Sequence, residues 1–220
     1  MPNKFIFLTS LSLQSSKPTE NRLLPFIKKS LEKGYHVQLI SPDSKQISYE
    51  NDRFEHSALN LENNKSNFFI IRLFTELYIS LKICLEVREK KPKIFLTTPS
   101  PLLIFFGFLF KRNNLIVDIR DLTWEYLPSS SYIQKFIKLI AKKTVHLALS
   151  YPSIITTSNS YEKKYIEKTF GAQDKVHLVS NGISLDKFSK LTELNQNKNN
   201  PSVGYFGSLG KAQGIDTIVE

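Results

Sequence analysis

Short continuous apolar runs alternate with helix-like stretches along most of the chain. The runs are "KFIFLT", "YHVQLIS", "KIFLTT", "NLIVDIRD", "SIITTS" and "KVHLVSN". Strands buried on both faces of a sheet read as uninterrupted apolar runs, whereas strands with one wet face alternate apolar and polar residues. Strands that alternate with helices are typical of parallel sheets. The pattern therefore predicts an α/β fold with a doubly wound, mostly parallel, Rossmann-like sheet and helices on both faces.

Local signals place the helices between these runs. Pro18 suits a first helical turn and Gly34 a C-terminal cap, which predicts a helix from about 18 to 33. Residues 41–67 are mostly polar and predict a long loop with room for a short strand near Phe54. The remaining predicted helices are an amphipathic one over 67–90 with Phe69, Leu73, Leu77, Leu81 and Leu85 four residues apart, a buried one in "PSPLLIFFGFLFKR", one over 131–149, and "YEKKYIEKTFG" ending at Gly171.

The segment "KLTELNQNKNNP", residues 190–201, interrupts this alternation. It holds four asparagines, a closing proline and few large apolar residues, which is typical of a linker. The following "SVGYFGSLG" starts a fresh strand and turn. The sequence therefore predicts a first domain over 1–190, a linker over 191–201 and the start of a second domain over 202–220.

The bulk composition restricts the kinds of site. The 30 Lys and Arg residues against 20 Asp and Glu leave a net charge of +10, which favours an anionic partner, although biased composition would give the same balance. Cys84 is the one cysteine and lies in an apolar helical pattern, so we expect a buried small hydrophobe. The four histidines have no zinc-ligand spacing, and no metal site is predicted.

Neither a membrane span nor a secretion signal is evident. The most apolar run has about nine continuous apolar residues where a span needs about twenty. Only four strongly apolar residues follow Lys4, too few for a signal-peptide core. We therefore expect a cytoplasmic protein, peripheral at most on the inner face of the cell membrane.

Familiar nucleotide and hydrolase motifs are missing. The loop after the first strand has no glycine, which argues against a nicotinamide-dinucleotide site and against a sugar-phosphate isomerase or epimerase on a similar sheet. No P-loop motif and no G-x-S-x-G elbow occurs.

The chain resembles the retaining glycosyltransferases of family 4, which have the two-domain GT-B architecture. The resemblance rests on "LIVDIRDLTWEYLPSS", "ITTSNSYEKKYI", "VHLVSNGISLDKF" and "VGYFGSLGKAQGIDTIVE", in that order. It points most closely to bacterial transferases for O-antigen, capsule or other surface polysaccharide, including lipopolysaccharide. It implies transfer of a hexosyl group from a nucleotide-sugar, which is a substrate, to a lipid-linked saccharide acceptor, with no cofactor.

The resemblance also implies roles for particular residues. Asn181 and Gly182 form the turn that closes the N-terminal, acceptor-binding domain. The glycine-rich turn after the linker would begin the donor-diphosphate cradle, although an ordinary strand-to-helix turn would look the same. Family members often carry an arginine and a lysine where this chain has Ser208 and Gln213. The donor-phosphate candidates are Gly207, Ser208, Lys211, Gln213 and Gly214.

The paired glutamates that hold the donor sugar in the family would come after Glu220. We therefore expect a truncated chain that does not turn over by itself, and no catalytic residue is assigned.

Acceptor-side candidates follow the first strand and the "NLIVDIRD" strand, because ligands of doubly wound sheets bind beyond the carboxyl ends of strands. All but Glu125 have a local alternative: the serines and Lys17 cap a helix, Asp118 pairs with Arg120, Asp121 caps a turn, and Trp124 packs rather than stacking on a sugar. The candidates are Ser12, Ser15, Ser16, Lys17, Asp118, Arg120, Asp121, Trp124 and Glu125.

The lysine-rich helices allow two further interpretations. Basic residues near an anionic bilayer each add about 1 kcal/mol of binding, and Phe105, Phe106, Phe108 and Phe110 lie beside Lys111 and Arg112. Peripheral membrane binding is therefore one hypothesis, and solvated helix faces are the alternative. A non-enzymatic basic α/β module that binds nucleic acid or a membrane is the competing function. The aromatic residues follow apolar helix or strand patterns, which argues against nucleic acid.

Overall fold

The computed structural model describes residues 4–61, 68–87, 93–97, 100–111, 114–182 and 189. Residues Met1–Asn181 form one compact unit and Gly182–Glu220 a second. The predicted linker and almost all of the second unit lie outside the described residues, so the domain boundary near residue 190 stays a prediction.

The elements in chain order are β1 (Lys4–Leu8), α1 (Lys17–Glu32), β2 (His36–Ser41), β3 (Phe54–Ala58), α2 (Phe69–Glu86), β4 (Lys93–Thr97), α3 (Pro101–Lys111), β5 (Leu115–Ile119), α4 (Tyr132–Leu149), β6 (Ile154–Thr157), α5 (Ser160–Phe170), the 3₁₀ turn η1 (Gln173–Lys175) and β7 (Val176–Leu178).

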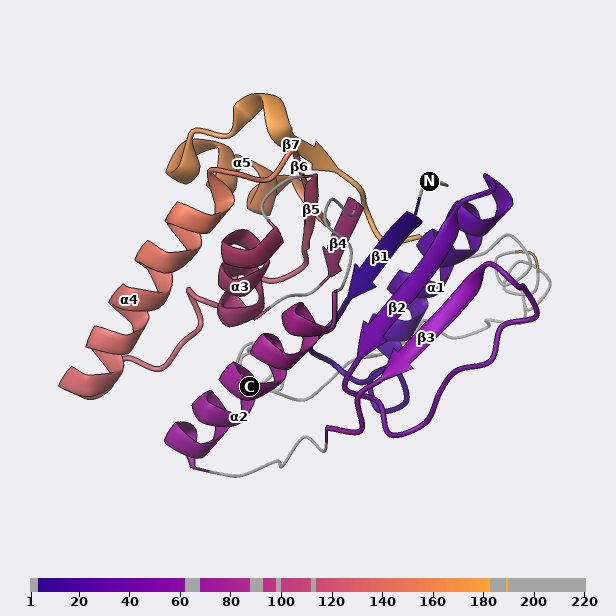
Figure 1. Ribbon diagram of the computed structural model, residues 1–220. Coiled ribbons are helices and arrows are strands. Elements are labelled where there is room, and N and C mark those ends of the chain that lie inside the picture. Colours follow the sequence, from indigo (N-terminus) through magenta and orange to yellow (C-terminus); the bar gives the residue numbers. More distant parts are fainter. Residues whose placement is uncertain are drawn as a thin grey trace, which may run out of the picture. The chain divides into compact units, whose positions relative to one another are not determined.

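The strands form a single seven-stranded sheet in the order β3-β2-β1-β4-β5-β6-β7, and every neighbouring pair is parallel. The predicted parallel α/β fold is therefore confirmed. The order changes direction between β1 and β4, so the connections wind both ways. Figure 1 shows α1 on one side of the sheet and α2, α3 and α4 on the other. Ligands of such sheets bind where the strand order reverses, beyond the carboxyl ends of the strands.

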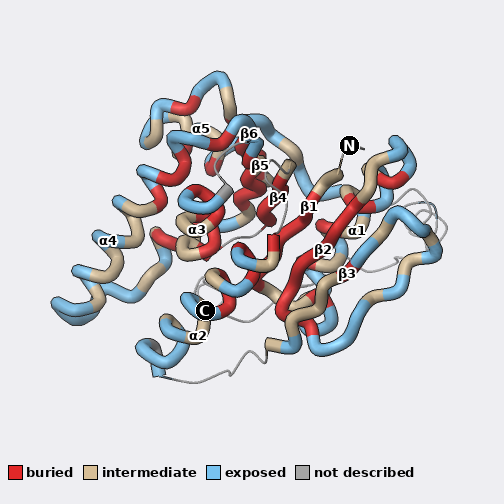
Figure 2. Tube along the Cα trace, viewed as in Figure 1, coloured by how far each residue is buried: buried red, intermediate tan, exposed pale blue. Residues whose placement is uncertain are grey.

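Alternate strand residues supply two cores, one on each face of the sheet. On the α1 side, Phe7 and Leu39 pack with Leu23 and Ile27 of the helix. On the opposite side a larger cluster joins Ile6, Leu96 and Val117 of the strands to the inner faces of α2 to α5. Figure 2 shows the buried residues concentrated along the strands between these layers. Cys84 belongs to the larger core and is 1% exposed, as its apolar pattern predicted.

The proline and glycine signals predicted for the ends of α1 and α5 are confirmed, and α4 has a cap that was not predicted. α1 has proline in its first turn, and Gly34, just past its end, adopts φ +83° and donates its N–H to the Leu31 carbonyl. Gly171 ends α5 with φ +63°, a left-handed conformation that suits glycine. α4 starts with a capping box in which Ser131 and Gln134 satisfy each other's backbone N–H groups.

The buried face of α2 differs from the stripe that its leucines suggest. Leu77 and Leu85 are 38% and 58% exposed, whereas Ile79 and Ile83 are buried in the core. Leucine spacing every fourth residue marked the helix correctly but did not identify the side that packs on the sheet.

We predict that Ile83→Ala lowers the free energy of unfolding by about 2–5 kcal/mol, because it leaves a cavity in the larger core. Ile70→Ala is the matched control on the same helix, since Ile70 is 59% exposed, and it should change stability by less than about 0.5 kcal/mol. Urea denaturation followed by circular dichroism measures both. Equal effects of the two substitutions would contradict the described packing of α2.

Candidate functional site

A buried carboxylate lies at the carboxyl end of β5. Asp118 has no exposed surface, and the strand register places it beside Thr97 of β4 and Thr156 of β6. Both threonine hydroxyls donate to it, at 3.0 and 2.5 Å. Arg22 of α1 donates from Nε at 3.2 Å and from Nη2 at 3.1 Å, and Arg120 donates from Nε at 2.8 Å. Five donors therefore occupy this carboxylate.

Burial works against the charges of this cluster. Loss of hydration raises the pKa of Asp118 to about 6, although the bond from Thr156, the charge of Arg22 and the bond from Thr97 lower it. The same burial lowers the pKa of Arg22, against the pull of Asp118. At neutral pH the carboxylate is ionised and paired with two guanidinium groups. Asp118 is thus a support within the fold, with no surface that can contact a substrate.

The two arginines connect this carboxylate to the chain that leaves β7. Arg22 Nη2 donates to the Val179 carbonyl at 3.1 Å, and Arg120 Nη1 donates to the Asn181 side-chain oxygen at 2.9 Å. Three residues singled out from the sequence, Asp118, Arg120 and Asn181, therefore meet in one cluster. Asn181 itself is exposed. The cluster fixes the end of the first compact unit against the sheet.

A second carboxylate organises the loop after β1. Asp43 is 1% exposed and accepts from Ser12 Oγ at 2.5 Å, from the backbone N–H groups of Leu13 and Gln14 at 3.2 and 3.1 Å, and from Ser41 Oγ at 2.5 Å. Although burial raises its pKa, these bonds together hold the pKa below its usual value. Ser12 thus anchors the loop rather than capping a helix, and Ser16, the N-cap residue of α1, makes no side-chain capping bond.

His56 of β3 extends the Asp43 cluster. The Ile47 N–H donates to Nδ1 at 2.8 Å, so Nε2 carries the proton and lies 2.8 Å from Ser41 Oγ, which in turn donates to Asp43. Burial lowers the pKa of His56, although the charge of Asp43 raises it. The neutral imidazole is therefore the form that this hydrogen-bond chain accommodates.

The other candidates of the first loop lie at the surface. Ser15 is exposed and donates its backbone N–H to Ser12 Oγ at 3.3 Å, while Ser16 Oγ lies 2.8 Å from Thr19 Oγ1. Lys17 pairs with Glu20 at 2.5 Å in the first turn of α1. The donor-phosphate candidates Gly207, Ser208, Lys211, Gln213 and Gly214 lie outside the described residues.

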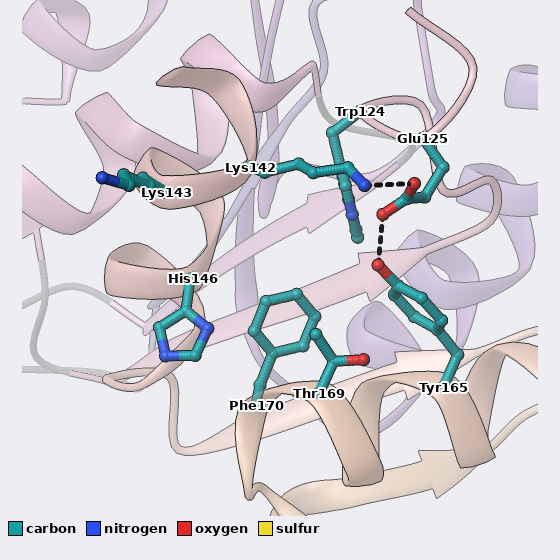
Figure 3. Close-up of a pocket in the computed structure, with 8 residues that line it drawn as sticks. All are labelled: Trp124, Glu125, Lys142, Lys143, His146, Tyr165, Thr169 and Phe170. Carbon is teal, nitrogen blue, oxygen red and sulfur yellow. Dashed lines mark hydrogen bonds and ion pairs between the residues drawn. The ribbon is translucent and has the colours of Figure 1, made fainter. Parts of the chain in front are cut away.

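Trp124 and Glu125 line a pocket of about 230 Å³ between the loop after β5 and helices α4 and α5 (Figure 3). Its other lining residues are Lys142, Lys143, His146, Tyr165, Thr169 and Phe170. Trp124 is 1% exposed and packs in the core, edge-on to Phe170 with 6.3 Å between ring centroids. Its environment is that of a packed indole rather than of an open stacking platform.

Glu125 is held from both sides of this pocket. Lys142 Nζ lies 2.7 Å from one carboxylate oxygen, and the Tyr165 hydroxyl donates to the other (Figure 3). Burial raises the pKa of Glu125, but the bonds from Lys142 and Tyr165 outweigh it and lower the pKa overall. Burial and the carboxylate also raise the pKa of Tyr165. Through Glu125, Lys142 and Tyr165, helices α4 and α5 are therefore both linked to the loop after β5.

The carboxyl edge of the sheet leaves a small polar set exposed. Ser15 follows β1, Asp121 follows β5, and Asn181 follows β7, and all three are exposed. Asp121 contributes its carbonyl to the following turn, where it accepts the Thr123 N–H at 2.8 Å. Hydroxyl, carboxylate and amide groups are the side chains that bind sugar hydroxyls.

Sequence reasoning did not single out Arg22, Asp43 or His56. Arg22 is a lone basic residue in an amphipathic helix, and no local signal shows that it reaches a strand ninety-six positions away. Asp43 carried a usable signal, because it follows the apolar strand "YHVQLIS" after one proline. Among the described residues no group of three or more His, Cys, Asp or Glu side chains could hold a metal ion.

Two solved structures have a similar arrangement of strands and helices. The fold is similar to a sucrose-phosphate synthase chain from Thermosynechococcus elongatus, with a TM-score of 0.51, 12% identity, and coverage of 86% of this chain and 95% of that chain. The chain has the fold of one GT-B glycosyltransferase half-domain. A glycosyltransferase from Rickettsia africae ESF-5 aligns with a TM-score of 0.42 and 12% identity, over 87% of this chain and 49% of that chain. No protein-family model and no curated protein matches.

We predict that Asp118→Asn lowers the free energy of unfolding by about 2–6 kcal/mol, because an NH₂ group replaces one of the two oxygens that accept from the threonine hydroxyls and the guanidinium groups. At least two of these donors then lose their acceptor. Asp121→Asn, on the same strand end but exposed, should change stability by less than about 0.5 kcal/mol. Urea titration at pH 7 measures both variants. A mild effect of Asp118→Asn would show that this ion cluster does not support the fold.

We also predict that His56 makes the protein sensitive to acid. Because its folded pKa lies below the unfolded value, its contribution to stability is complete above about pH 6.5 and is lost as the pH falls below that value. The stability advantage of the parent over His56→Gln should therefore shrink between pH 7 and pH 5, by at most about 1.4 kcal/mol per pH unit. His177→Gln, at an exposed histidine, is the control substitution and should change stability at pH 7 by less than about 0.5 kcal/mol.

The difference between variant and parent is the quantity to measure, because Asp118 acts in the opposite direction. The pKa of Asp118 is higher in the folded than in the unfolded state, so its contribution to the free energy of unfolding is lost as the pH rises through about 6. Thermal unfolding at half-unit pH steps gives both curves. A parent and a His56→Gln variant that keep a constant difference across this range would contradict the neutral, buried state of His56.

Proposed function

We propose that this chain is the acceptor-binding part of a glycosyltransferase that moves a sugar from a nucleotide-sugar to a lipid-linked saccharide in bacterial surface-polysaccharide synthesis. The observation that carries the proposal is the GT-B half-domain fold, present together with four family-like segments in the expected order. At 12% identity the structural likeness speaks for the fold. The reaction, its retention of anomeric configuration and the hexosyl donor follow from the resemblance of the segments.

The polar groups at the carboxyl edge suit an acceptor. A saccharide presents hydroxyl groups, for which the exposed Asp121 carboxylate and Ser15 hydroxyl are hydrogen-bonding partners. The two buried carboxylates, Asp118 and Asp43, are each occupied by donors from the protein. They hold the loops that carry the exposed groups, so that recognition rests on Asp121 and Ser15 and rigidity rests on the buried pair.

A nearby carboxylate also has a chemical use in glycosyl transfer. As the acceptor hydroxyl attacks the anomeric carbon it loses a proton, and a carboxylate within hydrogen-bond reach of that hydroxyl orients it. The leaving diphosphate needs cations or backbone N–H groups. We assign that task to the donor-phosphate candidates around Lys211, which lie outside the described residues.

We predict that the chain binds lipid-linked saccharides, or soluble saccharide fragments of them, and that Asp121→Asn weakens this binding at least tenfold, as loss of a charge-assisted hydrogen bond would. Saturation-transfer NMR with a panel of surface-polysaccharide fragments identifies the ligand, and titration calorimetry gives the affinity.

Asp174→Asn is the matched control, because Asp174 is an exposed carboxylate in the 3₁₀ turn that precedes β7, at the opposite edge of the sheet. It should bind like the parent. Absence of any saccharide binding, or equal affinities of the two variants, would contradict the assignment of the acceptor to this edge.

A further inference from the structure

The outward face of α4 is apolar. Six of its large apolar side chains are exposed, by between 48% and 91% of their surface, and they are Tyr132, Ile133, Phe136, Leu139, Ile140 and Leu147. The helix has a second apolar side that packs on the sheet through Val145, Ala148 and Leu149. A helix that needs only one buried stripe usually shows a polar outer face. The outer apolar residues of α4 therefore lie uncovered by the other elements of the described fold.

Two neighbouring helices continue this surface. α3 packs against both α2 and α4, and the three form one layer on the same side of the sheet (Figure 1). α2 exposes Phe74 by 66% and Ile70 by 59%, and α3 exposes Leu109 and Phe110 by 50% and 46%. We call the exposed residues of these three helices the outer helix face. Apolar side chains exposed on three neighbouring helices point to a contact surface, because proteins that fold alone rarely expose many of them together.

The charges on the outer helix face have one sign. α3 and α4 contain no Asp or Glu, and the two glutamates of α2, Glu76 and Glu86, are only partly exposed. The exposed charged residues described on the three helices are Arg72, Lys82, Lys135 and Lys143. Basic residues interspersed with aromatic and branched apolar side chains complement an anionic, half-apolar surface.

We propose that the outer helix face docks the protein onto an anionic lipid bilayer. The lysines and the arginine pair with lipid phosphates, and the aromatic and aliphatic side chains enter the boundary between headgroups and acyl chains. No helix among the described residues is long and apolar enough to cross a bilayer, so the contact is one of lying on the membrane. This inference rests on exposure and charge, and it holds whether or not the chain takes part in glycosyl transfer.

A second copy of the chain fits this face less well. Two copies meeting through it would bring together surfaces of the same sign, within a chain of net charge +10 and without exposed carboxylates on these helices to pair with the lysines. Nucleic acid would meet the same lysines but would leave the apolar side chains in water. An anionic bilayer would pair with the basic residues and would also remove the apolar side chains from water.

The proposed membrane contact lies mainly on α4, whereas the sequence suggested the aromatic run of α3. The aromatic run of α3 was the expected element, but Phe108 is 8% exposed in the core, and Phe105 and Phe106 pack against that core. Only Phe110 of the run contributes to the outer helix face. α4, which the sequence marked simply as a lysine-bearing helix, supplies most of the exposed apolar residues.

The test is sedimentation of the whole chain with vesicles of neutral phosphatidylcholine alone or mixed with phosphatidylglycerol. We expect binding to the mixed vesicles that weakens with salt, and at least a tenfold loss of partitioning for Lys135→Glu combined with Lys143→Glu. Lys28→Glu combined with Lys33→Glu is the charge-matched control, because both lysines are exposed at α1 on the other side of the sheet. The control should keep most of the binding.

Insertion is tested by Phe136→Trp, because the native Trp124 is buried and supplies a constant background. We expect the emission of the introduced indole to shift to the blue and to be quenched by brominated lipids on anionic vesicles. Circular dichroism verifies that each variant folds. Equal losses in the two double variants, binding that ignores lipid charge, or an introduced indole that stays unquenched would each overturn the proposal. Self-association through this face in sedimentation equilibrium without lipid binding would do the same.

Discussion

The carboxylate of Asp118 lies out of contact with solvent between Arg22 and Arg120, and the remaining structure of this region depends on that pairing. The cluster joins a helix from the start of the chain to strand β5, which lies inside the sheet between β4 and β6, and to the segment that leaves β7. Burying these charged groups costs hydration free energy, which the mutual attraction and the threonine hydroxyls offset in part. Such a cluster tolerates little displacement, so it fixes the carboxyl edge of the sheet.

Rigidity and recognition are divided between different side chains at that edge. Asp118 and Asp43 are saturated by donors from the protein itself, and they hold the loops after β5 and β1 in place. Asp121 and Ser15, which these loops carry, stay exposed. Sites built this way keep their geometry because the supporting hydrogen bonds are buried and protected from water. The proposed acceptor contact therefore relies on a frame that does not itself touch the acceptor.

The helices α2, α3 and α4 carry apolar residues on two sides, one toward the sheet and one toward solvent. Its inner residues, such as Ile83, Leu103 and Val145, complete the larger core, which folding requires. Its outer residues are apolar as well, which folding does not require and which water disfavours. The exposed charges described there are all basic. The bilayer contact that we propose would use this surface and would bring the sheet close to the lipid-linked acceptor that we propose.

The sequence by itself determined the main elements, their parallel arrangement and the glycine ends of α1 and α5. These follow from local periodicity and from the backbone freedom of Gly34 and Gly171. It also placed Asp118, Arg120 and Asp121 at a strand end. Only the tertiary structure decided that Arg22 pairs with Asp118 and that the outer side of α4 stays exposed. Both outcomes depend on contacts between residues far apart in the chain, which periodicity does not encode, and on which of two apolar helix faces meets the sheet.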